Sequence, residues 1–145
     1  MKGGAMKGYS KGNINTPGLR PKDFYFAHIE EKTLANSNYR QVLYTGPKSQ
    51  LVLMSLAPGE EIGEEIHEDH DQFFRFESGE GEVVVVDDVF TVRDGDCVVV
   101  PAGAKHNVIN TSSTLPLKLY TIYSPPEHPD GTVQKTRVEA MAAEG

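Results

Sequence analysis

The distribution of apolar residues along the chain predicts a protein built mainly from short β-strands. Apolar runs of about four to eight residues are separated by turns rich in glycine, proline, asparagine and aspartate, a spacing typical of an all-β sandwich or barrel. The predicted strands cover residues 23–30, 39–45, 50–57, 71–77, 82–86, 89–92, 97–100, 106–110 and 117–124, with a short extended piece over 62–67.

Two of these strands, at 83–86 and 97–100, are apolar at every position instead of alternating with polar residues. A strand of this kind is expected to be buried on both faces. In an antiparallel barrel only the inner face lies in the core, so the outer face needs a cover. The N-terminal strands or a second subunit could provide it, and we expect a homodimer. We expect Cys97 to be a small buried apolar residue.

The two ends of the chain differ from its centre. Residues 1–22 are rich in glycine, lysine, asparagine and proline, and we predict a flexible N-terminal arm there. Residues 23–124 form the predicted barrel. The prolines that follow exclude a strand interior, and residues 136–144 favour a helix, so 125–145 are predicted to be a tail with a short C-terminal helix. We expect this tail to pack on a barrel, its own or its partner's.

Composition narrows the class of protein. The length of 145 residues suits one domain, and the net charge of −7 argues against a nucleic-acid partner. No apolar run has membrane-spanning length, so we expect no membrane partner. The N-terminus lacks the apolar segment of a signal peptide, and Cys97 has no second cysteine to pair with. Both observations favour a cytoplasmic location.

Candidate chemistry is concentrated in residues 58–81, where acids, histidines and an amide lead directly into an aromatic strand. Residues two positions apart on a strand point to the same face. Glu65 and His67 therefore share one face, and Gln72 shares another with alternate aromatic residues. A carboxylate, an imidazole and an amide beside an aromatic wall predict half of a metal site. The best candidate for the other half is His106, and the candidate pocket wall is Phe74 and Phe76.

Two motifs carry a resemblance to a known family. Residues 95–110 have the spacing G-x5-P-x-G-x2-H-x3-N, which fully matches the second signature of the cupin family. The first signature has Pro-Gly, two histidines two residues apart, a glutamate and a glycine. Over residues 50–124 the chain resembles a small single-domain bacterial cupin, similar to proteins labelled mannose-6-phosphate isomerase-like. The first signature aligns with Pro58, Gly59, Glu65 and His67 in the histidine places, Gln72 in the glutamate place, and Gly79.

The resemblance implies an all-β, conical antiparallel β-barrel (the double-stranded β-helix or cupin jelly roll) whose motif side chains bind one metal. Two imidazole nitrogens and two oxygens suit a divalent transition metal such as Mn, Fe, Ni, Co or Zn. Four protein ligands leave one or two positions open for water or substrate. A barrel that has lost its metal is the alternative. The implied ligands are Glu65, His67, Gln72 and His106.

The fourth ligand has a competitor in His70. Counting by twos from the aromatic strand places Gln72 and His70 on one face, whereas counting from Glu65 and His67 places Asp69 and Asp71 there. The chain must therefore bend or bulge between His67 and Gln72. Imidazole chemistry favours His70 and the motif spacing favours Gln72. We expect Gln72 to be the ligand and His70 to lie at the rim, as an acid or base.

Two functions remain open. The first is a metal-dependent enzyme, of isomerase or oxygenase type, acting on a small polar substrate. The second is a non-catalytic small-ligand or metal-binding module. Only Arg75 and Lys105 lie near the motifs as cations, so a phosphate-binding cluster is not expected, and the fold does not decide function. We expect His128 to be a surface histidine.

Overall fold

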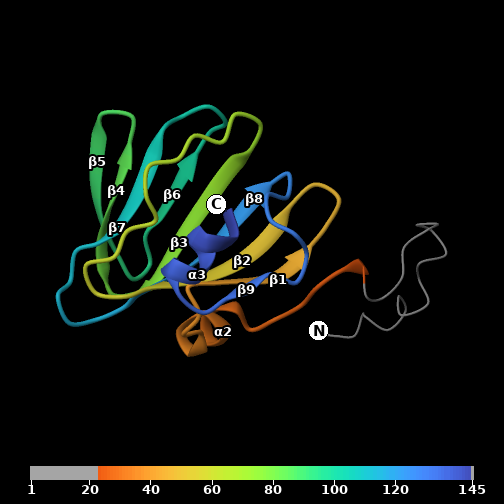
Figure 1. The fold of residues 1–145 in the computed structure, drawn as a ribbon, viewed down its shortest axis with the longest axis horizontal. Coiled ribbons are helices and arrows are strands. Elements are labelled where there is room, and N and C mark those ends of the chain that lie inside the picture. The colour runs from red at the N-terminus through yellow and green to blue at the C-terminus, as the bar shows by residue number, and fades with distance from the viewer. Residues whose placement is uncertain (1–22, 145) are drawn as a thin grey trace.

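Two antiparallel β-sheets form the body of the protein in a computed structural model that describes residues 23–144. The larger sheet has the strand order β6-β3-β8-β2-β1-β9 and the smaller one β5-β4-β7 (Figure 1). The described residues are mostly β, as expected, with two short helices among them, and the predicted arm over 1–22 lies outside these residues. The elements are α2 (Ile29–Ala35), β1 (Arg40–Thr45), β2 (Gln50–Leu56), β3 (Asp71–Ser78), β4 (Glu80–Val85), β5 (Asp88–Arg93), β6 (Cys97–Val100), β7 (His106–Asn110), β8 (Leu117–Ser124), β9 (Val133–Gln134) and α3 (Arg137–Glu144).

The core lies between the inner faces of the two sheets. Alternate residues of β2, β3 and β8 point inward, because side chains alternate along a strand, and they are completely buried. Val83 of β4 and Val108 of β7 meet them from the smaller sheet. Burying each large side chain contributes about 1.5–3 kcal/mol. The inward residues of the larger sheet include Val52, Met54, Phe74, Phe76 and Leu119.

The extended piece predicted over 62–67 extends the smaller sheet beyond β7. The amide of Ile62 donates to the carbonyl of Val108 at 2.9 Å. Glu65 and His106 exchange both backbone hydrogen bonds, at 2.9 and 3.0 Å. This pairing places the side chain of one predicted ligand opposite that of another.

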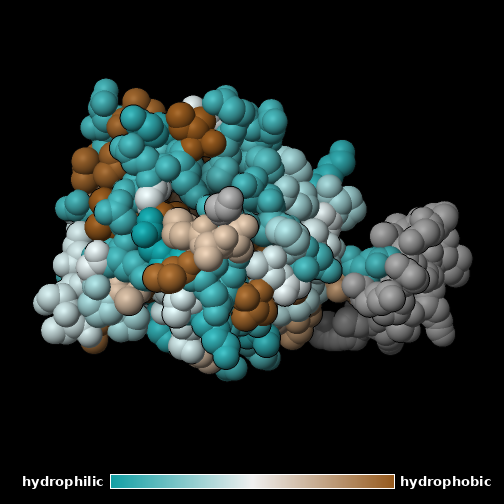
Figure 2. All heavy atoms as spheres, in the orientation of Figure 1, coloured by the Kyte–Doolittle hydropathy of each residue, from teal (hydrophilic) through white to brown (hydrophobic). Residues whose placement is uncertain are grey.

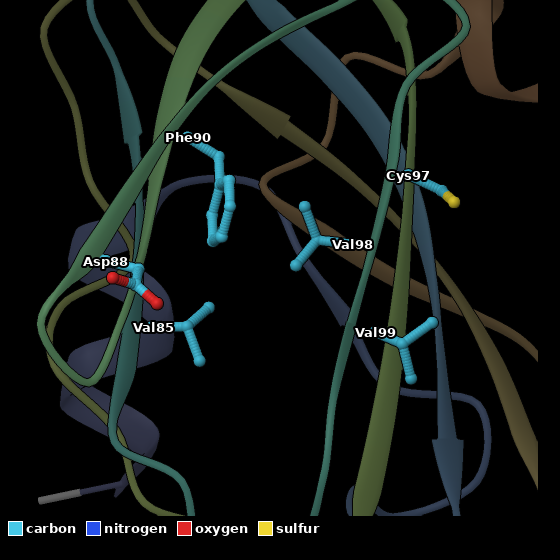
Figure 3. Close-up of a pocket in the computed structure, with 6 residues that line it drawn as sticks. All are labelled: Val85, Asp88, Phe90, Cys97, Val98 and Val99. Atoms are coloured by element: carbon cyan, nitrogen blue, oxygen red, sulfur yellow. The ribbon is translucent and has the colours of Figure 1, made fainter.

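The edges β5 and β6 face each other across a pocket of about 310 Å³ (Figure 3). Phe90 and Val85 point into the pocket from one side and Val98 from the other, whereas Cys97 and Val99 point away. Among residues 23–144 the two edges are not paired, so the strands form two sheets. The closed conical barrel implied by the resemblance stays an expectation.

The strand predicted over 23–30 is wrong. The described chain has no strand there, and α2 begins at Ile29. Phe24 and Phe26 are 57% and 82% exposed. The aromatic residues alternate as in a strand, but among the described residues this segment pairs with no strand of either sheet. His28, which we placed in that strand, has extended backbone and immediately precedes α2.

We predicted that the all-apolar strands at 83–86 and 97–100 are buried on both faces, and this prediction is wrong for a single chain. Val86 and Val99 are 58% and 64% exposed, and Cys97 is exposed instead of buried. Only the inner face of each sheet meets the core, so the outward side chains of β6, Cys97 and Val99, are exposed among residues 23–144. The outward Val84 of β4 is half-buried, and Val86 lies in the turn that follows β4. Apolar residues gather over the β4–β5 hairpin at the upper left of Figure 2.

The C-terminal tail packs on the body of its own chain, and the short helix predicted for it is confirmed. Strand β9 pairs with β1, and Ala140 of α3 is completely buried in the core. Arg137 donates to the carbonyl of Ile62 at 3.2 Å. Across residues 23–144, neither helix is long and apolar enough to span a membrane.

Candidate metal centre

Three of the four predicted ligands converge at the start of β7. Glu65 Oε1 lies 3.2 Å from His67 Nε2 and 3.9 Å from His106 Nε2. The possible ligand atoms of these residues all lie within 4.8 Å of one another. The backbone pairing of residue 65 with residue 106 brings the two motifs together. One carboxylate oxygen and two imidazole nitrogens therefore face a common point.

His106 is oriented by its own backbone neighbourhood. Its Nδ1 lies 3.0 Å from the carbonyl oxygen of Ala104, which can only accept, so Nδ1 carries a proton. The neutral ring then has its lone pair on Nε2. That atom is buried and has no hydrogen-bond partner, and the ring packs edge-on against Phe74 at 5.9 Å. A buried, unpaired imidazole lone pair suits a metal ligand.

Gln72 lies on the neighbouring strand wall and is 2% exposed. Its Nε2 donates to Thr121 Oγ1 at 3.0 Å, which fixes the amide. Its Oε1 is buried without a partner. Gln72 faces Tyr123 across β3 and β8, and the Tyr123 ring contacts the His67 ring at 5.7 Å. The amide oxygen of Gln72 is thus buried with its lone pairs unused, on the strand beside Tyr123.

His70 lies outside the first group. The predicted change of direction falls at residues 68–69, which form a turn. Beyond it, His70 Nε2 lies 3.0 Å from the carbonyl oxygen of Pro126 and 3.2 Å from Glu127 Oε1. His70 therefore joins His67 and Glu127 in a second group of possible ligands at the edge of the first.

The charges at the site are coupled. Burial alone would raise the pKa of Glu65, but the hydrogen bond and charge of His67 outweigh it and hold that pKa below its ordinary value. The hydrogen bond to Glu65 raises the pKa of His67 against the opposing effect of burial, and the charge of Glu127 adds to the increase. The carboxylate is therefore ionised at neutral pH, as a metal ligand must be.

Several residues of the site were not predicted. Arg40 is 1% exposed on β1, and its positive charge acts on both Glu65 and His67. Glu127 comes from the tail, as does His128, which we had placed on the surface and which is half-buried against Tyr123. The available signal for Arg40 was its place two residues before Val42, on the same face of the predicted strand.

Comparisons with known proteins identify the family of the fold. A family model described as "Cupin domain" matches residues 52–123. "Uncharacterized protein YrkC" of Bacillus subtilis (strain 168) is 46% identical over 142 residues, covering 94% of this chain and 75% of that protein. "Uncharacterized protein L612" of Acanthamoeba polyphaga mimivirus is 45% identical over 119 residues, covering 80% and 74%. The crystal structure of BH2720 from Bacillus halodurans is 44% identical, covers 87% of this chain and 97% of its own, and has a TM-score of 0.80.

Proposed function

The chain belongs to the cupin family, and we propose that it is a metal-dependent enzyme acting on a small polar molecule. The observation that carries this proposal is the buried, unpaired His106 Nε2, which lies in one group of possible ligands with Glu65 and His67. Buried polar atoms in native proteins are nearly always satisfied, so an unpaired imidazole nitrogen in a group with a carboxylate suits a bound cation. Gln72 Oε1 is a second buried atom without a hydrogen-bond partner.

The donor set fits one divalent transition metal. Glu65, His67 and His106 would hold it through one oxygen and two nitrogens, with Gln72 as the expected fourth ligand. When bound, the metal would supply Lewis-acid activation of a substrate oxygen, in isomerase-type or oxygenase-type chemistry. The ligands determine the formal charge of the site. Because Gln72 is neutral and stands in the glutamate place of the motif, Glu65 contributes the single negative charge of the proposed ligand set.

Arg40 bears on the kind of substrate. It is a buried positive charge that acts on His67, in addition to Arg75 and Lys105, the two cations near the sequence motifs. Arg75 instead lies 3.5 Å from Glu77. One arginine is not a phosphate-binding cluster, so the label mannose-6-phosphate isomerase-like is not extended to this chain. We therefore propose a small polar substrate and name no narrower class.

Elemental analysis of the purified protein, followed by titration of the chelator-treated protein with Mn, Fe, Ni, Co and Zn ions, tests the metal. We expect one ion per chain, lost in His106→Ala. A wild-type protein that holds none of these ions would refute the proposal. A substrate and oxygen-uptake screen of the metal-replete protein then separates an enzyme from a non-catalytic metal-binding or small-ligand module, the alternative function.

We also propose that the protein is a cytoplasmic homodimer. The support for the dimer is the exposed apolar surface of the unpaired edges, where Val89, Phe90 and Val99 are 58%, 46% and 64% exposed. An exposed apolar edge strand can pair with another chain, and large exposed apolar patches mark protein–protein interaction sites. Light scattering at micromolar concentration should give twice the monomer mass, and Phe90→Lys should reduce it to the monomer mass. A monomeric wild-type protein would contradict the proposal.

A further inference from the structure

The His67 ring lies between two carboxylates. Its Nε2 is 3.2 Å from Glu65 Oε1, and its Nδ1 is 3.8 Å from Glu127 Oε2. A neutral imidazole has one N–H and one lone pair, on different nitrogens. If the Nε2 lone pair faces a cation shared with Glu65, the proton must be on Nδ1, where it faces Glu127. The carboxylate of Glu127 therefore stabilises the tautomer that metal binding needs.

The position of Glu127 is built into the fold. The side chain of Gln50, which is completely buried, accepts hydrogen bonds from the backbone amides of Glu127 and His128 at 3.1 and 3.0 Å. Its Nε2 donates to the carbonyl of His128 at 2.7 Å and to Thr45 Oγ1 at 2.9 Å. One side chain of β2 thus holds the backbone on both sides of the Glu127–His128 peptide bond.

A second contact orients the carboxylate itself. Glu127 Oε1 is 3.2 Å from His70 Nε2, which leaves Oε2 for His67. At His106 the same position is filled by a hydrogen bond, 3.0 Å from Nδ1 to the carbonyl oxygen of Ala104, whereas the 3.8 Å between His67 Nδ1 and Glu127 Oε2 is an ion-pair distance. Metal-binding histidines commonly have such a partner on the second nitrogen, and its loss costs about 10–100-fold in metal affinity.

We infer that Glu127 is a positioning residue of the metal centre, which holds the His67 ring with Nε2 directed at Glu65 and His106. This inference rests on the proposed function, because it requires that the centre bind a metal. It gives the tail a role in metal affinity. It also gives His70 a role: His70 holds Glu127 and does not bind the metal.

The alternative is a second cation between His67, His70 and Glu127. The two groups compete for His67, because a neutral ring has only one lone pair. The first group contains the unpaired His106 Nε2, whereas His70 already faces a carboxylate and a backbone carbonyl. These contacts favour a single metal in the first group, with Glu127 as an outer partner.

The test is titration of the chelator-treated full-length protein with Co²⁺, whose visible absorption reports ligand geometry. Glu127→Ala should weaken Co²⁺ binding about tenfold or more and change the spectrum. Glu127→Gln keeps an acceptor oxygen and should lie between wild type and Glu127→Ala. The matched control is Asp130→Ala, which removes an exposed carboxylate of the same tail and should bind Co²⁺ as the wild type does.

Thermal unfolding of the metal-free variants separates positioning from stability: the midpoint of Glu127→Ala should equal that of Asp130→Ala. Equal Co²⁺ affinities of wild type and Glu127→Ala would overturn the inference and leave the proposed function intact. Two Co²⁺ ions per chain, reduced to one in both Glu127→Ala and His70→Ala, would overturn it in favour of the second cation site. A wild type that binds no Co²⁺ and holds no other metal would refute the proposed function itself.

Discussion

Replacing His128 by glutamine should make the metal-free protein less sensitive to acid. The His128 ring packs edge-on against Tyr123, with ring centres 5.1 Å apart, and its Nε2 lies 3.3 Å from the Tyr123 hydroxyl oxygen. Burial lowers the pKa of His128 from 6.5 to about 4, and the positive charge of Arg40 contributes in the same direction. The folded protein therefore keeps this ring neutral.

The sign of the effect follows from this difference. Above about pH 6.5 the ring is neutral in both folded and unfolded chains, so it contributes no pH dependence. As the pH falls from 6.5 towards 4, the unfolded chain binds a proton that the folded chain excludes, and stability is lost. The full difference corresponds to about 3 kcal/mol, of which about 2 kcal/mol is lost by pH 5.

Urea unfolding of wild type and His128→Gln at about pH 7.5 and about pH 5, after removal of metal, measures this loss. The wild type should lose about 2 kcal/mol more than the variant between the two conditions. Glu65 and His67 are present in both proteins, and their charges also act on His128, so the comparison measures the loss due to His128 together with this coupling. Equal losses, or an NMR titration that places the pKa of His128 near 6.5, would refute the reasoning.

Further predictions concern the ligands, a motif glycine and the tail. Gln72→Leu should weaken metal binding while His70→Ala keeps one metal per chain, and metal analysis showing the reverse would make His70 the ligand. Gly79→Ala should cost at least about 2 kcal/mol in urea unfolding, because a Cβ would collide with a backbone oxygen at a positive φ. The control Gly103→Ala, also at positive φ but in open space, should cost about 1 kcal/mol, the lower end of the cost of a left-handed conformation for a residue with a Cβ. Deleting residues 125–145 should lower the thermal unfolding midpoint sharply, and an unchanged midpoint would mean that tail packing contributes nothing.

Most strands could be predicted because alternation and turn residues are local properties. Each predicted strand from 39–45 onwards matches a strand of the structure to within two residues at either end. The same locality explains the failure at 23–30, where Tyr25 stacks on Tyr44 of β1 but no strand is formed. The convergence of Glu65, His67 and His106 was expected from motif spacing, and the turn at 68–69 falls in the stretch where the two side-chain parities conflict.

What could not be predicted depends on chain segments far apart in sequence. Nothing near Glu127 in the sequence indicates that it meets His67 and His70, because the contact requires the tail to return across β2. Likewise, the exposure of Val99 depends on which face of the sheet another element covers. A run of apolar residues indicates that burial is favourable, but it does not identify what supplies the cover.

The tail explains two polar residues at buried strand positions that the apolar pattern alone does not. Arg40 is 1% exposed, and its Nη1 donates to Gln134 of β9 at 2.7 Å and lies 3.7 Å from Glu144 of α3. Gln50 is completely buried and uses its amide to hold the backbone at 127–128. Buried polar groups left unpaired cost about 1–3 kcal/mol each. The tail pairs the side-chain amide of Gln50 and Nη1 of Arg40, whereas Arg40 Nε is buried without a partner. The change in composition after residue 124 therefore marks the end of the strands and the start of a tail that packs on the same folded unit. The hydrogen bonds from Gln50 that hold this tail also place Glu127 beside His67.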